Sequence, residues 1–212
     1  MMPPILDTVE EAGHAVFTRG AFNVNLIGVR AATDEANKFD DRLHLVYRDD
    51  FGSWVDLAFR CTTDPGLYWR EQPGRREGAA ILKAGQYRGA YKIGLHRGRY
   101  PALVQRKPVT VWRDRDKDQT LDHVPGTERT GLYGINIHHS GEAAEKLVDR
   151  WSAGCTVLAN LNDWAIFMAV IRRSADRYGD SFTYTLINER KKNDGYARRK
   201  DQVWRLWQGI HF

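Results

Sequence analysis

The sequence predicts one mainly β domain with a few helices, an α+β fold arranged as a sandwich or a barrel. The chain has 212 residues, enough for one proper hydrophobic core, and 42% of them are hydrophobic. Short apolar stretches, several alternating with polar residues, recur between turns rich in Gly, Pro, Asn and Asp. Helical spacing is limited to two or three segments. No internal repeat, phosphate-binding loop or dinucleotide fingerprint is present, so we expect a single domain over residues 1–212.

The predicted elements begin with an N-terminal helix over residues 5–18, where apolar residues recur at mostly helical spacing. The core of the domain is expected over about residues 22–188. A second helix is predicted from about Trp164 to Arg173, capped by Asn162 or Asp163. Strands are predicted over residues 22–29, 43–47, 54–59, 81–82, 87–93, 109–113, 135–138 and 182–187.

The polar segments between these elements are expected to be loops. In residues 30–41, Asn and Asp favour turns more than a metal site. The segment from Asp114 to Asp122 starts like a calcium loop but lacks the Gly and the Glu that such a loop needs, so a charged hairpin loop is predicted, with a weak metal alternative. A helical turn is expected over 142–150. Residues 189–212 form a basic, aromatic C-terminal segment, for which a helix packed on its own domain is favoured over a docking segment.

Charge and composition limit the classes of partner. The formal net charge of +5 and a pI of about 9.2 predict affinity for polyanions, such as nucleic acid, an anionic cell wall or an acidic stem peptide. The basic residues are dispersed and no nucleic-acid motif is present, so no specific nucleic-acid partner is expected. No apolar run has membrane-spanning length, and the first residues do not have the pattern of a secretory signal. The two cysteines, Cys61 and Cys155, are too few for a disulfide framework, and two free thiols are favoured.

The candidate catalytic residues lie between residues 133 and 160. A predicted strand of alternating apolar and polar residues ends at His138. Cys155 follows Gly154, and a turn of small residues there can expose the sulfur and leave backbone N–H groups free to face an oxyanion. A histidine within reach would be the base that forms the thiolate. A lone Cys or a lone His is more often structural, but the two together predict a Cys–His site.

This pattern resembles the L,D-transpeptidase catalytic domain, also called the YkuD type. In that family an Ile-His element precedes a Ser-x-Gly-Cys motif, and Ile137-His138 and Ser152-Ala153-Gly154-Cys155 match both. Residues 82–87 look like a degenerate copy of the family's Thr-Pro-x-Gly-x-aromatic element. The resemblance covers roughly residues 43–188, and only the His and Cys blocks are specific. The family usually carries Arg two residues after the Cys, where this chain has Val157, so no residue is assigned to carboxylate recognition.

The resemblance implies a mainly β fold with the catalytic Cys on a strand–loop, and acyl transfer from peptidoglycan stem peptides. Cys155 would be the nucleophile and His138 its base. The N–H groups of Gly154 and Cys155 would form the oxyanion hole, and Ser152 would orient the turn or the imidazole. The thiolate would displace the terminal D-Ala, and an amine or water would resolve the thioester, so that the enzyme is a transpeptidase or a carboxypeptidase/endopeptidase. No metal or other cofactor is needed.

The expected site of action is the cell wall. A chain made in the cytoplasm without a secretory signal would need release through a membrane pore, as for a phage lysis enzyme, or export as an effector.

Four further residues are predicted to contact substrate: His139, Tyr87, His96 and Trp151. Strand alternation puts His138 and His139 on opposite faces, and the family match favours His138 as the base. Tyr87 belongs to the degenerate aromatic element, His96 lies in a predicted loop that could border a site, and Trp151 directly precedes the Ser152 motif.

Two other functions stay open. One is a Cys–His hydrolase, which would use the same site as an endopeptidase or amidase on another peptide or amide. Val157 stands where the family has Arg, and this difference is the reason for considering another substrate. A basic binding module for nucleic acid or a wall polymer would make Cys155 and His138 structural. That module predicts salt-dependent polyanion binding that does not change when Cys155 is replaced.

Overall fold

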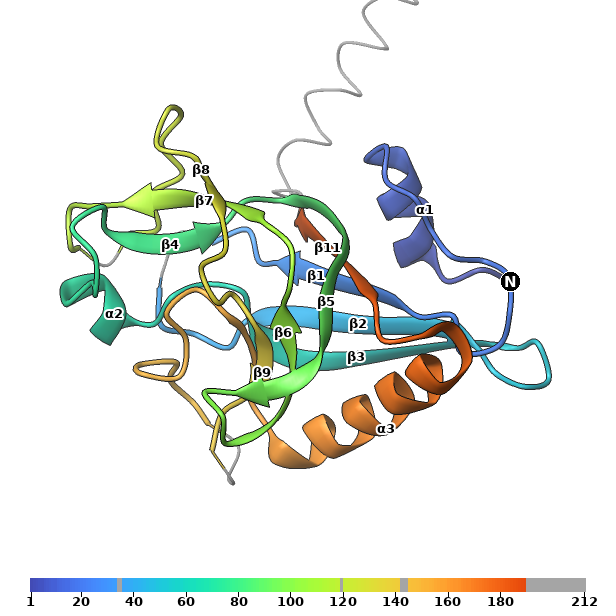
Figure 1. Ribbon diagram of the computed structural model, residues 1–212. Helices are drawn as coiled ribbons and strands as arrows, with labels where there is room; N and C mark the ends of the chain where they lie inside the picture. Colours follow the sequence, from blue (N-terminus) through green and yellow to red (C-terminus); the bar gives the residue numbers. More distant parts are fainter. Residues whose placement is uncertain (34–35, 119, 142–144, 190–212) are drawn as a thin grey trace, which may run out of the picture.

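The computed structural model describes residues 1–33, 36–118, 120–141 and 145–189. It is mainly β, as predicted, and its principal sheet closes into a barrel in the order β1-β11-β5-β6-β9-β10-β3-β2 (Figure 1). The barrel strands are β1 (Asn25–Arg30), β2 (Asp41–Arg48), β3 (Trp54–Thr62), β5 (Gly85–His96), β6 (Tyr100–Gln105), β9 (Ile137–His139), β10 (Thr156–Leu158) and β11 (Phe182–Asn188).

A second, three-stranded antiparallel sheet stands at one end of the barrel. It consists of β4 (Ala79–Leu82), β7 (Val109–Asp114) and β8 (Arg129–Gly131), in the order β4-β7-β8. Figure 1 shows this sheet above the short helix α2 (Leu67–Glu71), on the left of the view. Gly154 approaches the carbonyl oxygen of Ala80 in β4, so the second sheet and the Ser152–Cys155 turn are neighbours.

Alternation along the strands explains why β1 and β2 are covered on both sides. In β2, Leu43 and Leu45 point into the main core, whereas Val46 packs outside the barrel against α1 (Pro4–Glu11). The helix contributes Leu6 and Val9, both fully buried, to this outer cluster. The apolar stripe of the short helix therefore matches the outward apolar face of the strands.

The N-terminal helix is shorter than the sequence pattern predicted. It ends at Glu11 rather than at residue 18, and the chain then continues without regular structure. Gly13 has φ +78°, and its N–H and that of His14 donate to Glu10 O and Val9 O. A left-handed glycine of this kind terminates a helix whatever the spacing of the apolar residues beyond it.

The long helix α3 (Leu161–Tyr178) extends beyond the predicted 164–173 at both ends. Its cap is Asn160, whose side chain accepts a hydrogen bond from Asn162 N at 2.8 Å, so the prediction of Asn162 or Asp163 as the cap was wrong. Gly179 ends the helix with φ +84°. The buried face joins the main core through four apolar residues, Trp164, Phe167, Met168 and Ile171.

Several elements were absent from the sequence prediction. Strand β6 contains Pro101, a residue that argues against a strand. Strand β8, strand β10 and helix α2 have three to five residues each, too few for a visible period. The predicted strand over 22–29 begins later, at Asn25.

Two predictions fall wholly or partly outside the described residues. The helical turn predicted over 142–150 falls partly outside them, and residues 145–150 contain a bend, an isolated bridge from Leu147 to Lys38 and a turn instead. The predicted C-terminal segment lies outside them from residue 190 onward. No helix in the described part of the chain is long and apolar enough to cross a membrane.

Candidate active site

Cys155 and His138 come from two adjacent parallel strands. β9 and β10 pair in the register Thr156 to Ile137 and Val157 to His138. Ile137 belongs to the main core, so its neighbours along the strand face the opposite side. Cys155, which directly precedes β10, and His138 therefore lie on the same outer face of the barrel. The structure places His139 on the other face, 5.7 Å from the ring of Trp164.

The turn before Cys155 is held by Ser152. Its hydroxyl donates to Cys155 O at 2.8 Å and accepts from Gly154 N at 3.1 Å. Gly154 has φ +120°, and a Cβ there would overlap the carbonyl oxygen of Ala80. Only glycine satisfies both the backbone angle and the close approach to β4. Ser152 thus orients the turn, whereas no contact with an imidazole is seen for it among the described residues.

The thiol of Cys155 is protected in this structure. Sγ donates to Gly134 O and accepts from Asn136 N, both at 3.4 Å, and the residue is 7% exposed. It packs in an outer apolar cluster with Phe39, Val148 and Val157. Burial raises the pKa of the Cys155 thiol to about 11, so the thiol is protonated at neutral pH. A thiolate–imidazolium pair is therefore not expected before substrate binds.

His138 is oriented for accepting a proton at one nitrogen. Nδ1 lies 2.8 Å from His139 O and 3.1 Å from the Tyr100 hydroxyl. A carbonyl oxygen only accepts, so Nδ1 carries the hydrogen and Nε2 holds the lone pair. Nε2 is buried and has no hydrogen-bond partner. Burial, with a smaller contribution from His96, lowers the pKa of His138 to about 3, so the ring is neutral at rest.

The β5–β6 hairpin completes the cluster. His96, at the end of β5, stacks on His138 with 3.9 Å between ring centroids, and its Nδ1 accepts from the side-chain amide of Asn136 at 3.1 Å. Burial, followed by the nearby Arg97, lowers the pKa of His96 to about 4. Tyr100, which begins β6, was missed by the sequence analysis because its strand was not recognised. Asn136 was expected to be a polar residue of a strand, and no feature of the sequence was a reason to place it in the site.

Two predicted substrate contacts do not join this cluster. The Tyr87 hydroxyl donates to Lys83 O at 2.5 Å and Thr110 O at 3.1 Å, which ties β5 to the second sheet. Its hydroxyl is committed to this junction, and its contact with substrate stays a prediction. Trp151 is 38% exposed on the loop before Ser152 and lies against Gly141.

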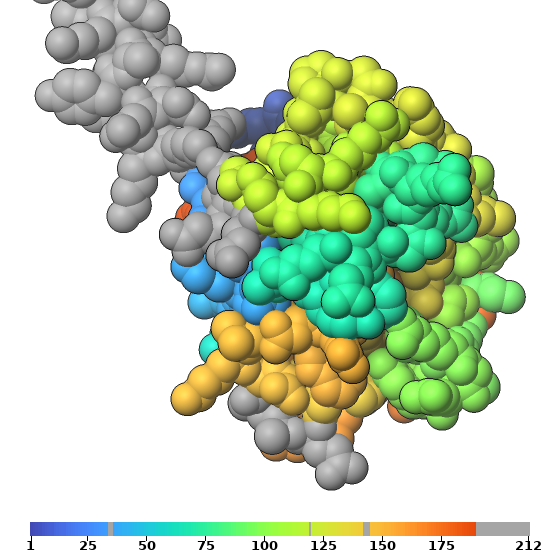
Figure 2. All heavy atoms as spheres, turned by 90° about the vertical axis from the view of Figure 1, so that its left-hand side faces the viewer, coloured from blue at the N-terminus to red at the C-terminus, as the bar shows by residue number. Residues whose placement is uncertain are grey.

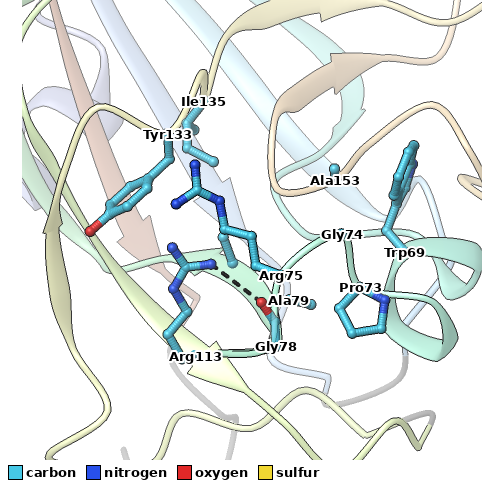
Figure 3. A pocket seen from close by; sticks show the side chains of 11 residues that line it. Trp69, Pro73, Gly74, Arg75, Gly78, Ala79, Arg113, Tyr133, Ile135 and Ala153 are labelled. Carbon is cyan, nitrogen blue, oxygen red and sulfur yellow. Dashed lines mark hydrogen bonds between the residues drawn. The ribbon is translucent and has the colours of Figure 1, made fainter.

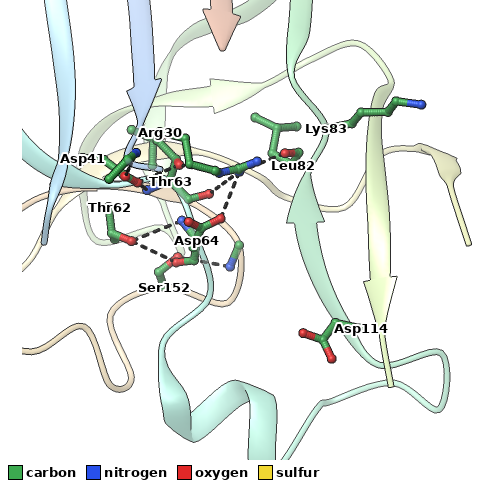
Figure 4. Close-up of polar contacts among 12 residues, drawn as sticks. Arg30, Asp41, Thr62, Thr63, Asp64, Leu82, Lys83, Asp114 and Ser152 are labelled. Carbon is green, nitrogen blue, oxygen red and sulfur yellow. Dashed lines mark hydrogen bonds and ion pairs between the residues drawn. The ribbon is translucent and has the colours of Figure 1, made fainter. Parts of the chain in front are cut away.

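A buried ionic network lies beside the turn and supports it (Figure 4). Arg30 pairs with Asp64 at 3.0 Å and donates to Thr63 and to Leu82 O, while Asp41 accepts from the N–H and hydroxyl of Thr63. Burial, then the charge of Asp64, raises the pKa of Asp41 to about 7. The chain that leaves this network reaches Gly66, whose N–H donates to Ser152 O at 2.9 Å. The network thereby fixes the loop that carries Ser152.

The acidic loop after β7 is the place where a cation could bind. Asp114, Asp116 and Asp122 bring one oxygen each within 4.8 Å of one another. Asp114 is already paired with the fully buried Arg70 at 2.7 Å, so part of the negative charge is compensated. Whether an ion joins them stays an open prediction of the sequence.

Comparison of the chain with protein-family models, curated proteins and solved structures gives no match.

Proposed function

We propose that this protein is a cysteine acyltransferase of the L,D-transpeptidase type, acting on peptidoglycan stem peptides. One observation carries the proposal: the buried, unpartnered Nε2 of His138 lies on the same barrel face as Cys155. Leaving a buried ring nitrogen without a partner costs free energy, and a base held ready for proton transfer would explain why this nitrogen has none. The third member that orients the base is the backbone carbonyl of His139.

The mechanism begins when Sγ leaves its hydrogen bond to Gly134 O and turns toward His138. The thiol proton passes to Nε2, and the thiolate attacks the carbonyl carbon that precedes the terminal D-Ala. Collapse of the tetrahedral intermediate breaks the C–N bond, and the leaving amine takes the proton back from Nε2. An amine or a water then attacks the thioester and loses its proton to Nε2; the C–S bond breaks, and the released thiolate takes this proton from Nε2, which regenerates the thiol.

The surroundings of the pair suit the charges that appear during this cycle. The imidazolium formed on His138 is stabilised by His139 O and by the Tyr100 hydroxyl, which lies 3.3 Å from the same carbonyl. The Gly154 N–H donates to Ser152, so it is not a free oxyanion donor as the sequence had suggested. The N–H of Cys155 itself is the remaining candidate for that role.

The test is intact mass spectrometry after incubation with a carbapenem, which acylates thiol nucleophiles of the resembled family. We expect one adduct on the wild-type protein and none on Cys155→Ala, with Cys61→Ala as the matched control that keeps the adduct. Digested peptidoglycan then tests for loss of D-Ala or new stem-peptide cross-links. A Cys155 that alkylates readily but forms no carbapenem adduct would instead favour a Cys–His hydrolase with another substrate.

The main alternative is a basic binding module in which Cys155 is structural. The observation that favours it is the burial of the thiol in an apolar cluster, which raises its pKa to about 11. This alternative predicts no adduct, slow alkylation at neutral pH, and polyanion binding that falls steeply with salt and is the same in Cys155→Ala.

A further inference from the structure

A pocket of about 210 Å3 opens beside the Ser152–Cys155 turn (Figure 3). Its wall includes Ala153 from this turn, and Tyr133 and Ile135 from the segment that leads into β9. The opposite wall comes from the loop after α2 and from β7. In Figure 2 this face of the molecule is turned to the viewer, with α2 and its loop in teal between β7 in yellow-green and residues 145–155 in orange. A ligand bound in this pocket would contact Ala153, which lies two residues before the candidate nucleophile, whereas Cys155 itself does not line the pocket.

Arg113 from β7 lies in the wall of this pocket without a carboxylate partner among the described residues. The residue is 5% exposed, its Nη1 donates to Gly78 O at 3.3 Å, and its guanidinium lies 4.7 Å above the ring of Tyr133. Its Nε is buried and has no hydrogen-bond partner. Burying a charge is costly unless it is paired, and a breach of this rule at a pocket wall indicates a missing anion.

The other two buried arginines in the described part of the chain each form an ion pair with a buried aspartate. Arg30 pairs with Asp64 at 3.0 Å, and Arg70 pairs with Asp114 at 2.7 Å. Asp114 directly follows Arg113 in the sequence, so its charge is already committed to another guanidinium. Arg70 also has two nitrogens without a hydrogen-bond partner, Nε and Nη1, so what sets Arg113 apart from the other two is that it has no carboxylate partner among the described residues.

A second guanidinium reaches the same place. Arg75, an exposed residue of the loop after α2, extends across the pocket toward Arg113 and the Tyr133 ring in Figure 3. An adjoining pocket is also basic: Arg75, Arg76, Arg115 and Lys117 line it. None of the residues that line these two pockets, all in the described part of the chain, is acidic. Two like charges aimed at one space repel each other until an anion occupies it.

We infer that this pocket is a carboxylate-binding site, in which Arg113 and Arg75 hold the carboxylate of a small organic acid. The walls formed by Trp69, Pro73 and Ile135 suit the carbon atoms of such a ligand and distinguish it from an inorganic anion. Planar guanidinium groups bind a carboxylate through paired hydrogen bonds.

The assignment to a substrate rests on the proposed function. In an L,D-transpeptidase-type reaction, the group bound by Arg113 and Arg75 is the terminal carboxylate of the acyl donor, next to the scissile bond. The site then supplies the carboxylate recognition that position 157 cannot give, because Val157 is fully buried.

The test measures binding to the full chain carrying Cys155→Ala, which cannot turn the ligand over. The probes are diacetyl-L-lysyl-D-alanine and its C-terminal amide, titrated by calorimetry or NMR. We expect the acid to bind about tenfold or more tightly than the amide, because charge-assisted hydrogen bonds are lost in the amide. Arg75→Ala should weaken the acid about fivefold and leave the amide unchanged. Arg113→Lys should weaken the acid more, with a thermal melt to verify folding.

Arg76→Ala is the matched control, since it removes the same charge from an adjacent residue that lines only the adjoining pocket. Its acid affinity should stay within about twofold of the parent. Four outcomes would overturn the inference. The acid and the amide could bind equally, or the acid could fail to bind. Arg75→Ala and Arg76→Ala could lose equal affinity, or an equal concentration of inorganic phosphate could displace the acid. An inert Cys155 with acid-selective binding would refute the proposed function alone, whereas an acylated Cys155 without acid selectivity would refute this site alone.

Discussion

Two buried polar clusters lie near the Ser152–Cys155 turn, and they differ in whether the basic side chain at their centre has a partner for each functional nitrogen. Around Arg30, the guanidinium pairs with Asp64 and donates to Thr63 and Leu82 O, while Asp41 accepts from Thr63. Around His138, by contrast, Nε2 has no partner and the Cys155 thiol makes only long bonds to backbone atoms. The first cluster resembles a structural clamp. The second keeps a base unsatisfied, which suits a group that acts on a substrate.

Removing the base gives the strongest test of the difference between the two clusters. His138→Gln should reduce acyl transfer about 10²- to 10⁴-fold, the range that general acid–base catalysis contributes. A thermal melt accompanies this variant, because the replacement also removes the Nδ1 contacts to His139 O and Tyr100 and the ring contact with His96. Thioester formation with a carbapenem, followed by mass spectrometry, measures the rate. An unchanged rate would assign His138 to the structural class.

The corresponding change in the other cluster should act on stability. Arg30→Met leaves Asp64 and Asp41 buried without their cation and should lower the free energy of unfolding by about 3–5 kcal/mol. Urea unfolding measures it. Arg173→Met is the control, since its partner Asp50 is 42% exposed in the side chain and the change should stay below about 1 kcal/mol. Similar losses in both variants would contradict the distinction between buried and surface ion pairs.

The protonation state of the thiol gives a pH test. Burial raises the pKa of Cys155 to about 11, so the thiolate fraction should rise about tenfold per pH unit between pH 7 and 9.5. The rate of iodoacetamide alkylation in Cys61→Ala protein, which retains this single thiol, reports that fraction. A rate that is already constant from pH 6 upward would instead mean that a thiolate–imidazolium pair exists at rest.

The smallest expected effect tests the orientation of the base. Tyr100→Phe removes a hydroxyl that contacts His138 Nδ1, but His139 O still accepts the Nδ1 proton. We expect kcat to fall about tenfold or less with KM unchanged, in line with one neutral hydrogen bond. Tyr178→Phe is the matched control: it removes a hydroxyl at the end of α3 that donates to Ala21 O, and it should leave both constants unchanged. A change in KM alone would indicate a substrate contact rather than a positioning role.

The sequence by itself determined the features whose cause is local. The mainly β class follows from short alternating segments, and the site turn follows from Gly154, which must adopt φ +120° beside β4. The order of polar residues along one strand was enough to put His138 and His139 on opposite faces. Local signals also misled where one glycine overrode a longer pattern, as at Gly13, which ends α1 early.

Only the tertiary structure decided what surrounds the pair. His96 and Tyr100 reach His138 because β5 and β6 form a hairpin beside β9, and such pairing between distant segments leaves no periodic trace in the sequence. The same holds for Arg113. In the sequence it is one basic residue in a strand next to an aspartate, and only the fold gives that aspartate to Arg70 and leaves Arg113 unpaired at a pocket. Burial and pairing, which set the pKa of each group, are properties of these long-range contacts.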